Sequence, residues 1–187
     1  NIFKQTYRTI KLAHTNKFTL ESIYGISWFW FFGFFFMASL PSFCRDIIRG
    51  NEIIATIYLA VISVGMGGGS VLGEKLTQGK LRTGIVGIGG IGLSIFALLL
   101  SLTPANTSNE LLSISELIKS SSFIFSNVYL FLIGIFGGLL IVPLYTQLQI
   151  KCPEKSRSQF IASNNIMNAL FMVMAAIFSM LMLKISL

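Results

Sequence analysis

Five long apolar segments alternate with short polar ones along this chain of 187 residues. Each apolar segment holds roughly 20 residues or more, which is the length that a helix needs to cross a bilayer. The pattern therefore predicts an all-α integral membrane protein with five transmembrane helices. The expected spans cover about residues 24–43, 53–73, 83–103, 123–149 and 158–183.

The composition agrees with this class. The chain is 53% hydrophobic and only 11% charged, whereas soluble domains have about 25% charged residues. Its net charge of +7 would suit a nucleic-acid partner. However, the basic residues lie in short loops between the apolar segments, where the positive-inside rule places them. We therefore expect membrane lipids as partners and no nucleic acid.

The loop charges also predict an orientation. Residues 1–23, the loop at 74–82 and the loop at 151–157 together hold ten of the 14 Lys and Arg residues. Because cytoplasmic loops carry the excess of Lys and Arg, these three segments and the N-terminus are expected to be cytoplasmic. The two cysteines, Cys44 and Cys152, then lie at opposite faces and are not expected to form an intrachain disulfide.

The first 23 residues are basic, with aromatic residues interleaved. This pattern fits either a cytoplasmic loop anchored by its charges or a basic amphipathic helix on the bilayer surface. The chain begins at Asn1 without a methionine, and five is an awkward number of helices for a self-contained bundle. Both features lead us to expect a piece of a longer protein.

Glycines recur at helical spacing in two of the apolar segments. In the second segment Gly65, Gly69 and Gly73 are four residues apart, and in the fourth Gly134 and Gly138 are. Residues four apart share a helix face, and small residues on that face let another backbone approach closely in lipid. These five glycines are therefore expected to mediate helix packing.

A charged turn follows the glycines of the second segment. Its charges and one from the 151–157 loop are candidates for a cytoplasmic gate: Glu74, Lys75, Lys80, Arg82 and Arg157. They either form an ionic lock on one conformation or stay solvated. The sequence leaves both readings open.

The residue inventory gives no support for catalysis. The run Gly87–Gly92 matches G-x-G-x-x-G, but the dinucleotide motif needs a preceding strand and a βαβ unit, so these glycines are expected to serve helix packing. There is one histidine, His14, and no paired carboxylates or activated nucleophile. We expect no catalytic residue, no metal and no cofactor in this region.

Polar and aromatic residues inside the spans are the candidates for binding. Asn164 and Asn168 share a helix face, and amides in hydrocarbon need partners, so they either hold helices together or bind a headgroup. Gln147 has the same two readings. Trp28 and Trp30 lie in a span far more aromatic than crossing requires. They are either lipid-facing bulk or a wall for an acyl chain.

Four stretches carry a resemblance to a known family. The segment from Val64 to Thr83 resembles the loop signature of the major facilitator superfamily, although Glu74 stands where the signature has Asp. Three further stretches are similar to the lysophospholipid transporter branch, in particular to transporter domains fused to an acyltransferase and an acyl-carrier-protein ligase. These stretches are Ile26–Gly33, Phe136–Tyr145 and Arg157–Met172.

The resemblance implies most of the C-terminal half of a major facilitator bundle. Residues 1–23 would be the cytoplasmic loop between the halves, and residues 24–187 the transmembrane domain. The implied activity is the movement of a lysophospholipid, such as lysophosphatidylethanolamine, across a bacterial inner membrane for reacylation. The implied partners are the missing N-terminal half and a fused or associated acyltransferase.

Two other functions remain open at this point. One is that of a facilitator for another solute or drug, and the other is that of a membrane anchor for fused acyltransferase and ligase domains without transport. Trp28, Trp30, Gln147, Asn164 and Asn168 are the substrate-binding candidates under the first interpretation.

Overall fold

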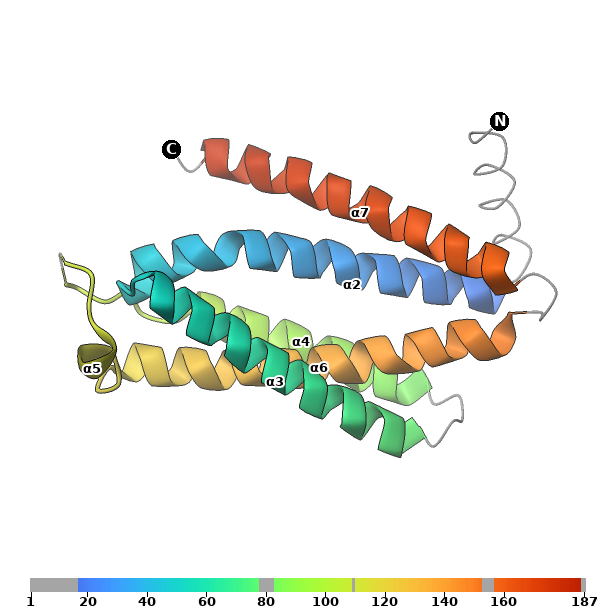
Figure 1. Ribbon diagram of the computed structural model, residues 1–187, viewed down its shortest axis with the longest axis horizontal. Helices are drawn as coiled ribbons and strands as arrows, with labels where there is room; N and C mark the ends of the chain where they lie inside the picture. Colours follow the sequence, from blue (N-terminus) through green and yellow to red (C-terminus); the bar gives the residue numbers. More distant parts are fainter. Residues whose placement is uncertain (1–16, 78–82, 109, 153–156, 186–187) are drawn as a thin grey trace. The chain divides into compact units, whose positions relative to one another are not determined.

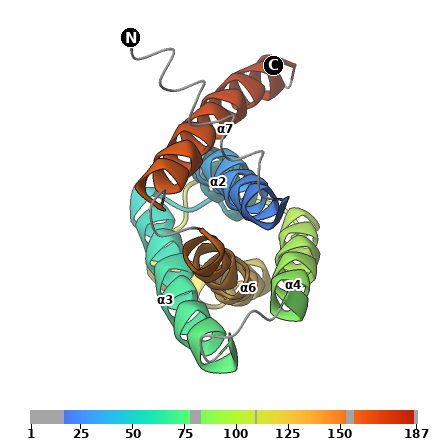
Figure 2. The same cartoon turned by 90° about the vertical axis from the view of Figure 1, so that its right-hand side faces the viewer.

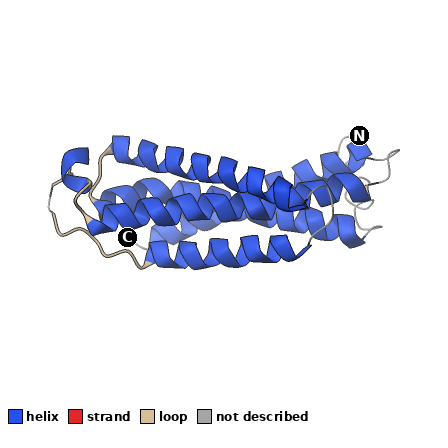
Figure 3. Cartoon of the chain, turned by 90° about the horizontal axis from the view of Figure 1, so that it is seen from below, coloured by secondary structure: helices blue, strands red, loops and turns tan. Residues whose placement is uncertain are grey.

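The computed structural model describes residues 17–77, 83–108, 110–152 and 157–185. Within these ranges the chain is helical, with no strand and one isolated bridge between Gly50 and Leu112 (Figure 3). The elements are α2 (Lys17–Ser42), the π-helix η1 (Phe43–Ile48), α3 (Glu52–Thr77), α4 (Thr83–Ser101), α5 (Ile114–Leu117), α6 (Ser121–Lys151) and α7 (Arg157–Ile185).

Five of these helices are long and apolar enough to cross a membrane, as the sequence predicts. The first of these spans, Thr19–Ile48, runs from α2 into η1, and the other four lie in α3, α4, α6 and α7 (Figure 1). These five helices indicate a membrane-embedded protein. The part of the basic N-terminal segment before Lys17, whose sequence fits either a cytoplasmic loop or an amphipathic surface helix, lies outside the described residues.

One helix end differs clearly from the expected spans. Helix α2 begins at Lys17 rather than near residue 24, and its first turns already bury Ser22 and Ile23. Residues 17–23, expected to belong to a loop, therefore contribute about two turns of packed helix. Pro41 and Pro143 both lie inside helices. Proline lacks the N–H of the helical ladder, yet α6 runs unbroken past Pro143.

The chain divides into two compact units. The terminal unit contains Asn1–Ala38 and Pro143–Leu187, and the central unit contains Ser39–Val142. In the terminal unit α2 contacts α7 through aromatic rings. Tyr24 lies 6.4 Å from Phe171, and Phe35 lies 5.4 Å from Phe178, measured between ring centroids. Aromatic pairs at such separations add to stability beyond the contribution of the area that they bury.

In the central unit α6 lies between α3 and α4 (Figure 2). Glycines allow α3 and α6 to approach so closely that a side chain at these positions would collide with the backbone of the other helix. A Cβ atom added to Gly134 would lie 2.5 Å from the Ile62 carbonyl oxygen, and one added to Gly138 would lie 2.5 Å from the Ser70 nitrogen. On α3, Gly65 faces Phe131 and Gly69 faces Ile135 in the same way.

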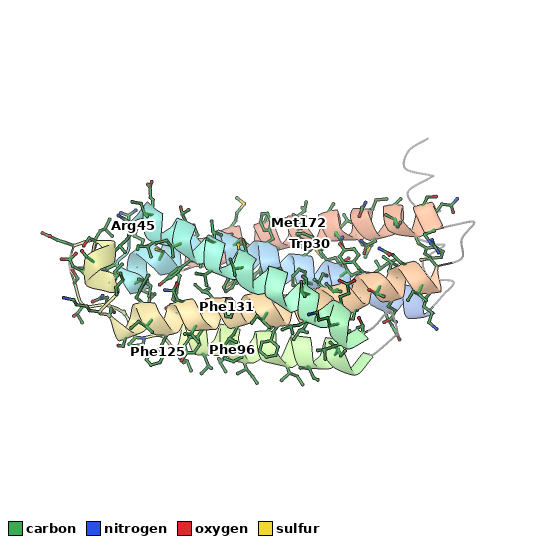
Figure 4. All side chains as sticks on the ribbon, turned by 60° about the horizontal axis from the view of Figure 1, so that its bottom comes forward. Trp30, Arg45, Phe96, Phe125, Phe131 and Met172 are labelled. Carbon is green, nitrogen blue, oxygen red and sulfur yellow. The ribbon has the colours of Figure 1, made fainter. Side chains whose placement is uncertain are left out.

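The contact between α4 and α6 also depends on glycine. A Cβ atom on Gly89 would lie 2.6 Å from the Leu140 nitrogen, and one on Gly92 would enter the ring of Phe136. Phe96, labelled in Figure 4, continues this contact. It stacks on Phe136, with 5.5 Å between the ring centroids. The G-x-G-x-x-G run therefore lies in a helix and supplies two of these contact glycines.

A short polar cap closes one end of the central unit. Backbone hydrogen bonds tie the loop after α4 to the turn before α3: Asn106 N donates to Ile47 O at 2.7 Å, and Leu112 N to Arg49 O at 2.7 Å. Arg49 has φ of 60°, a left-handed conformation that is uncommon outside glycine. The tertiary hydrogen bonds on this turn hold it there.

Helix α5 has a capping box that makes it sensitive to acid. The backbone nitrogen of Ser113 donates to Glu116 Oε2 at 2.8 Å, and its hydroxyl donates to the same oxygen at 2.7 Å. These bonds lower the pKa of Glu116 below its ordinary 4.5, so their stabilisation is present above about pH 4.5 and is lost as the pH falls through the lowered pKa.

We therefore expect Glu116→Ala, which removes the accepting oxygen, to expose the amides of α5 to hydrogen exchange at neutral pH. Exchange rates of the amides of residues 116 and 117 should rise several-fold. Glu110→Ala, at an exposed glutamate in the same loop without a capping role, is the matched control. Equal protection in Glu116→Ala and wild type would contradict this role.

Candidate functional site

A buried hydrogen bond joins two helices of the terminal unit. Ser27 of α2 donates through Oγ to Oδ1 of Asn168 on α7 at 2.9 Å, and both residues are buried. In hydrocarbon such a polar contact between helices favours association, typically by about 0.6 kcal/mol and up to about 1.7 kcal/mol. Asn168 therefore links α7 to α2.

Asn164 lies one turn earlier on α7 and differs in one respect. It is only 1% exposed, yet its Oδ1 atom has no hydrogen-bond partner among the described residues. An unsatisfied buried polar group costs about 1–3 kcal/mol. Asn164 thus keeps an unused acceptor at a buried position, one turn from a satisfied amide. We call Ser27, Asn164 and Asn168 the amide seam.

The two tryptophans lie on the same helix, α2, in different surroundings. Trp28 is 61% exposed and stacks on Phe31 at 5.2 Å. Trp30, labelled in Figure 4, is 39% exposed. Its indole nitrogen donates to the Tyr145 hydroxyl on α6 at 3.3 Å. Trp30 is therefore held in one orientation by a helix that carries another candidate, Gln147.

Gln147 is buried near the end of α6. Within the described chain no hydrogen bond joins it to the amide seam. The terminal unit thus contains all five substrate-binding candidates, of which only Asn164 and Asn168, on adjacent turns of α7, are directly shown to be neighbours.

The gate candidates are only partly described. Glu74 and Lys75 are exposed in the last turn of α3, and Arg157 is exposed at the start of α7. No ion pair is formed by Glu74 or Lys75 with any other described residue. Lys80 and Arg82 lie outside the described residues, so the expected lock remains a prediction.

Both cysteines are free and buried: Cys44 and Cys152. Burial raises the pKa of the Cys152 thiol above its ordinary 9.0. Since the thiolate is the nucleophilic form, this shift disfavours reaction of Cys152 at neutral pH. Among the described residues, no group of three or more His, Cys, Asp or Glu side chains is placed to hold a metal ion.

Two partners of the candidates escaped sequence reasoning. Ser27 and Tyr145 each bond a candidate side chain through long-range packing. Serine and tyrosine are common in membrane helices, and no local pattern marks them as partners. Only the register between α2 and its neighbours identifies these two.

Comparison with known proteins adds one finding. Residues 116–179 match a family described as "Protein of unknown function (DUF2985)", a match that covers less than half of the chain. It runs from the end of α5 through α6 into α7, and so includes Gln147, Asn164 and Asn168. No curated protein and no solved structure matches the chain.

Proposed function

We propose that the chain forms part of a major-facilitator-type carrier that moves a lysophospholipid, such as lysophosphatidylethanolamine, across a bacterial inner membrane. The observation that carries the proposal is the unused acceptor of Asn164. A membrane helix that needed only packing would gain by replacing this amide with an apolar side chain. A substrate that donates a hydrogen bond, through its ammonium or its glycerol hydroxyl, would satisfy it.

The aromatic residues of α2 support an amphiphilic rather than a purely polar substrate. Trp28 leaves most of its ring uncovered by the chain, and Trp30 is oriented by Tyr145. Rigid aromatic surfaces bind apolar chains at low entropic cost. A polar acceptor on α7 and an aromatic surface on α2 together match a molecule with a headgroup and one acyl chain.

The proposal includes the remaining parts of the carrier. Major facilitators work by rocking of two helical halves around a central site, so the helices of the other half are needed for transport. The proposed orientation has the N-terminus in the cytoplasm, with Glu74, Lys75, Lys80, Arg82 and Arg157 as the gate. A fused or associated acyltransferase would consume the lysolipid that arrives.

A substrate panel tests the proposal against its rivals. Full-length protein in vesicles should take up lysophospholipids at least about tenfold faster than diacyl phospholipids or a hydrophilic drug, because the site holds one chain and one headgroup. Trp30→Ala should slow uptake several-fold, whereas Trp30→Phe, which keeps a ring, should slow it less.

Other outcomes would identify the other functions. Preference for a drug or hydrophilic solute would indicate another facilitator. No uptake of any compound by folded protein, with lysolipid acylation intact, would indicate a membrane anchor for the attached enzymes. Unchanged lysolipid uptake by Trp30→Ala would remove the acyl-chain role of the aromatic surface.

A further inference from the structure

A pocket of about 410 Å³ opens at the capped end of the central unit. Two charged residues of opposite sign line it: Arg45, from η1, and Glu52, the first residue of α3. Figure 4 shows Arg45 at the end of this unit where the α5 loop lies. The volume is within the range of small-molecule sites, about 300–1,000 Å³. We call this cavity the Arg45 pocket.

The two charges are not used by the protein itself. Both side chains are exposed, and neither forms an ion pair or a side-chain hydrogen bond with any described residue. An exposed ion pair between them would contribute at most about 1 kcal/mol, so little free energy would be lost if each charge paired with a ligand instead.

A third polar group belongs to the same wall. Asn51 lines the pocket, and its Oδ1 atom caps α3 by accepting from the nitrogens of Ile53 at 3.2 Å and Ile54 at 3.3 Å. Its amide nitrogen donates to no described residue. The pocket therefore offers a guanidinium and an amide N–H as donors, and a carboxylate as an acceptor.

The frame around these groups is rigid. Gly50 N donates to Cys44 O at 3.0 Å across the turn. The loop that supplies Leu111 is held to the same turn by the bond from Leu112 N to Arg49 O. A Cβ atom on Gly50 would lie 2.9 Å from the Cβ atom of buried Ile54, so Ile54 also packs closely against the turn. The charges are thus presented from fixed backbone rather than from a free loop.

The rest of the lining is largely apolar. It consists of Pro41, Cys44, Gly50, Ala55 and Leu111, so the pocket has apolar surface beside its charged groups. An apolar side suits a compound whose charged part continues into carbon chain. A simple anion or cation would use only one of the two charges and would leave the other unpaired.

We propose that the Arg45 pocket binds a small zwitterion that carries a phosphate and a primary ammonium, the chemistry of a phosphoethanolamine headgroup. Arg45 binds the phosphate in the paired geometry that guanidinium favours, Asn51 donates to a phosphate oxygen, and Glu52 accepts from the ammonium. The inference rests on the proposed function for its role: by the loop charges this end faces outward, where a lysolipid would first meet the carrier.

Equilibrium binding to purified full-length protein in detergent tests the site with water-soluble probes. The probes are glycerophosphoethanolamine, which carries both charges, glycerophosphoglycerol, which carries only the phosphate, and ethanolamine, which carries only the ammonium. The wild type should bind the first about tenfold more tightly than either of the others, because only it uses both charges.

Charge-neutralising variants assign the contacts. Glu52→Gln should weaken glycerophosphoethanolamine about five- to tenfold and leave glycerophosphoglycerol unchanged, whereas Arg45→Gln should weaken both. Asp46→Asn, which removes an exposed charge beside Arg45 outside the pocket lining, is the matched control and should change neither. Melting temperatures of the three variants establish that each is folded.

Several results would overturn the site. They are no binding of glycerophosphoethanolamine by folded wild type, unchanged binding in both Arg45→Gln and Glu52→Gln, or an equal loss in Asp46→Asn, which would indicate surface charge alone. Lysophosphatidylethanolamine separates the sources of the headgroup: tighter binding than glycerophosphoethanolamine indicates a lipid, and equal binding indicates a free phosphoamine.

Transport separates this inference from the proposed function. If the pocket binds its probe but wild-type protein moves no lysolipid in vesicles, the pocket stands and the carrier function fails. If lysolipid moves equally well in wild type, Arg45→Gln and Glu52→Gln while none of them binds the probe, the carrier function stands and the pocket fails.

Discussion

Gly69→Leu is expected to lower the melting temperature by about 2–12 °C. A Cβ atom on Gly69 would lie 2.7 Å from the Cα and carbonyl carbon of Ile135 on α6, and would overlap the Ile135 oxygen. These are backbone atoms, so relief requires the helices to separate. Overpacking a tight contact costs about 1–3 kcal/mol, and each kcal/mol lowers the midpoint by about 2–4 °C at this chain length.

Gly68 provides a control one residue away. A Cβ atom there would have nothing within 4 Å, so Gly68→Leu adds the same side chain to the same helix without touching α6. Because leucine favours helix over glycine, Gly68→Leu should melt at or above the wild-type temperature. Equal melting temperatures of the two variants would show that the packing of α3 against α6 does not depend on the close approach at Gly69.

Asn164→Leu is expected to separate function from stability. It removes a buried amide whose Oδ1 has no partner among the described residues, so the protein should melt at the wild-type temperature or higher. If the same atom accepts a hydrogen bond from the substrate, lysolipid transport should fall at least tenfold, which is the loss of about 1.4 kcal/mol of binding. Melting and vesicle uptake measure the two effects.

Asn168→Leu should behave in the opposite way on stability. It removes the acceptor of Ser27, so the protein should lose about 1 kcal/mol and melt about 2–4 °C lower. An Asn164→Leu variant that transports normally and melts at a lower temperature would show instead that Asn164 holds helices together. The sequence allowed both interpretations, and the pair of variants decides between them.

The five helices were predictable because lipid imposes a simple rule. Backbone N–H and C=O groups in hydrocarbon must form their hydrogen bonds within the segment. A long apolar run such as Thr83–Ser101 is therefore expected to form a helix, as it does. The four-residue spacing of Gly65 and Gly69 likewise predicts a close helix contact. It does not name the partner, because any small-residue face is acceptable; the structure places α6 there.

The polar sites were less accessible to sequence reasoning. Asn164 and Asn168 look equivalent in the sequence, and only the register of α2 against α7 gives Asn168 a partner in Ser27. Arg45 and Glu52 look like ordinary charges of a neutral loop. They share a cavity because Arg49 takes a left-handed conformation and the loop containing Leu111 folds back over the turn, which are tertiary effects.

The most direct test of the proposed carrier is movement of lysolipid between leaflets. Full-length protein is reconstituted in vesicles whose outer leaflet contains fluorescent lysophosphatidylethanolamine, and a membrane-impermeant quencher reports what remains outside. A lysolipid carrier should remove the outer-leaflet signal at least about tenfold faster than it is lost from protein-free vesicles. A rate equal to that of protein-free vesicles, with the protein folded and inserted, would contradict the proposed function.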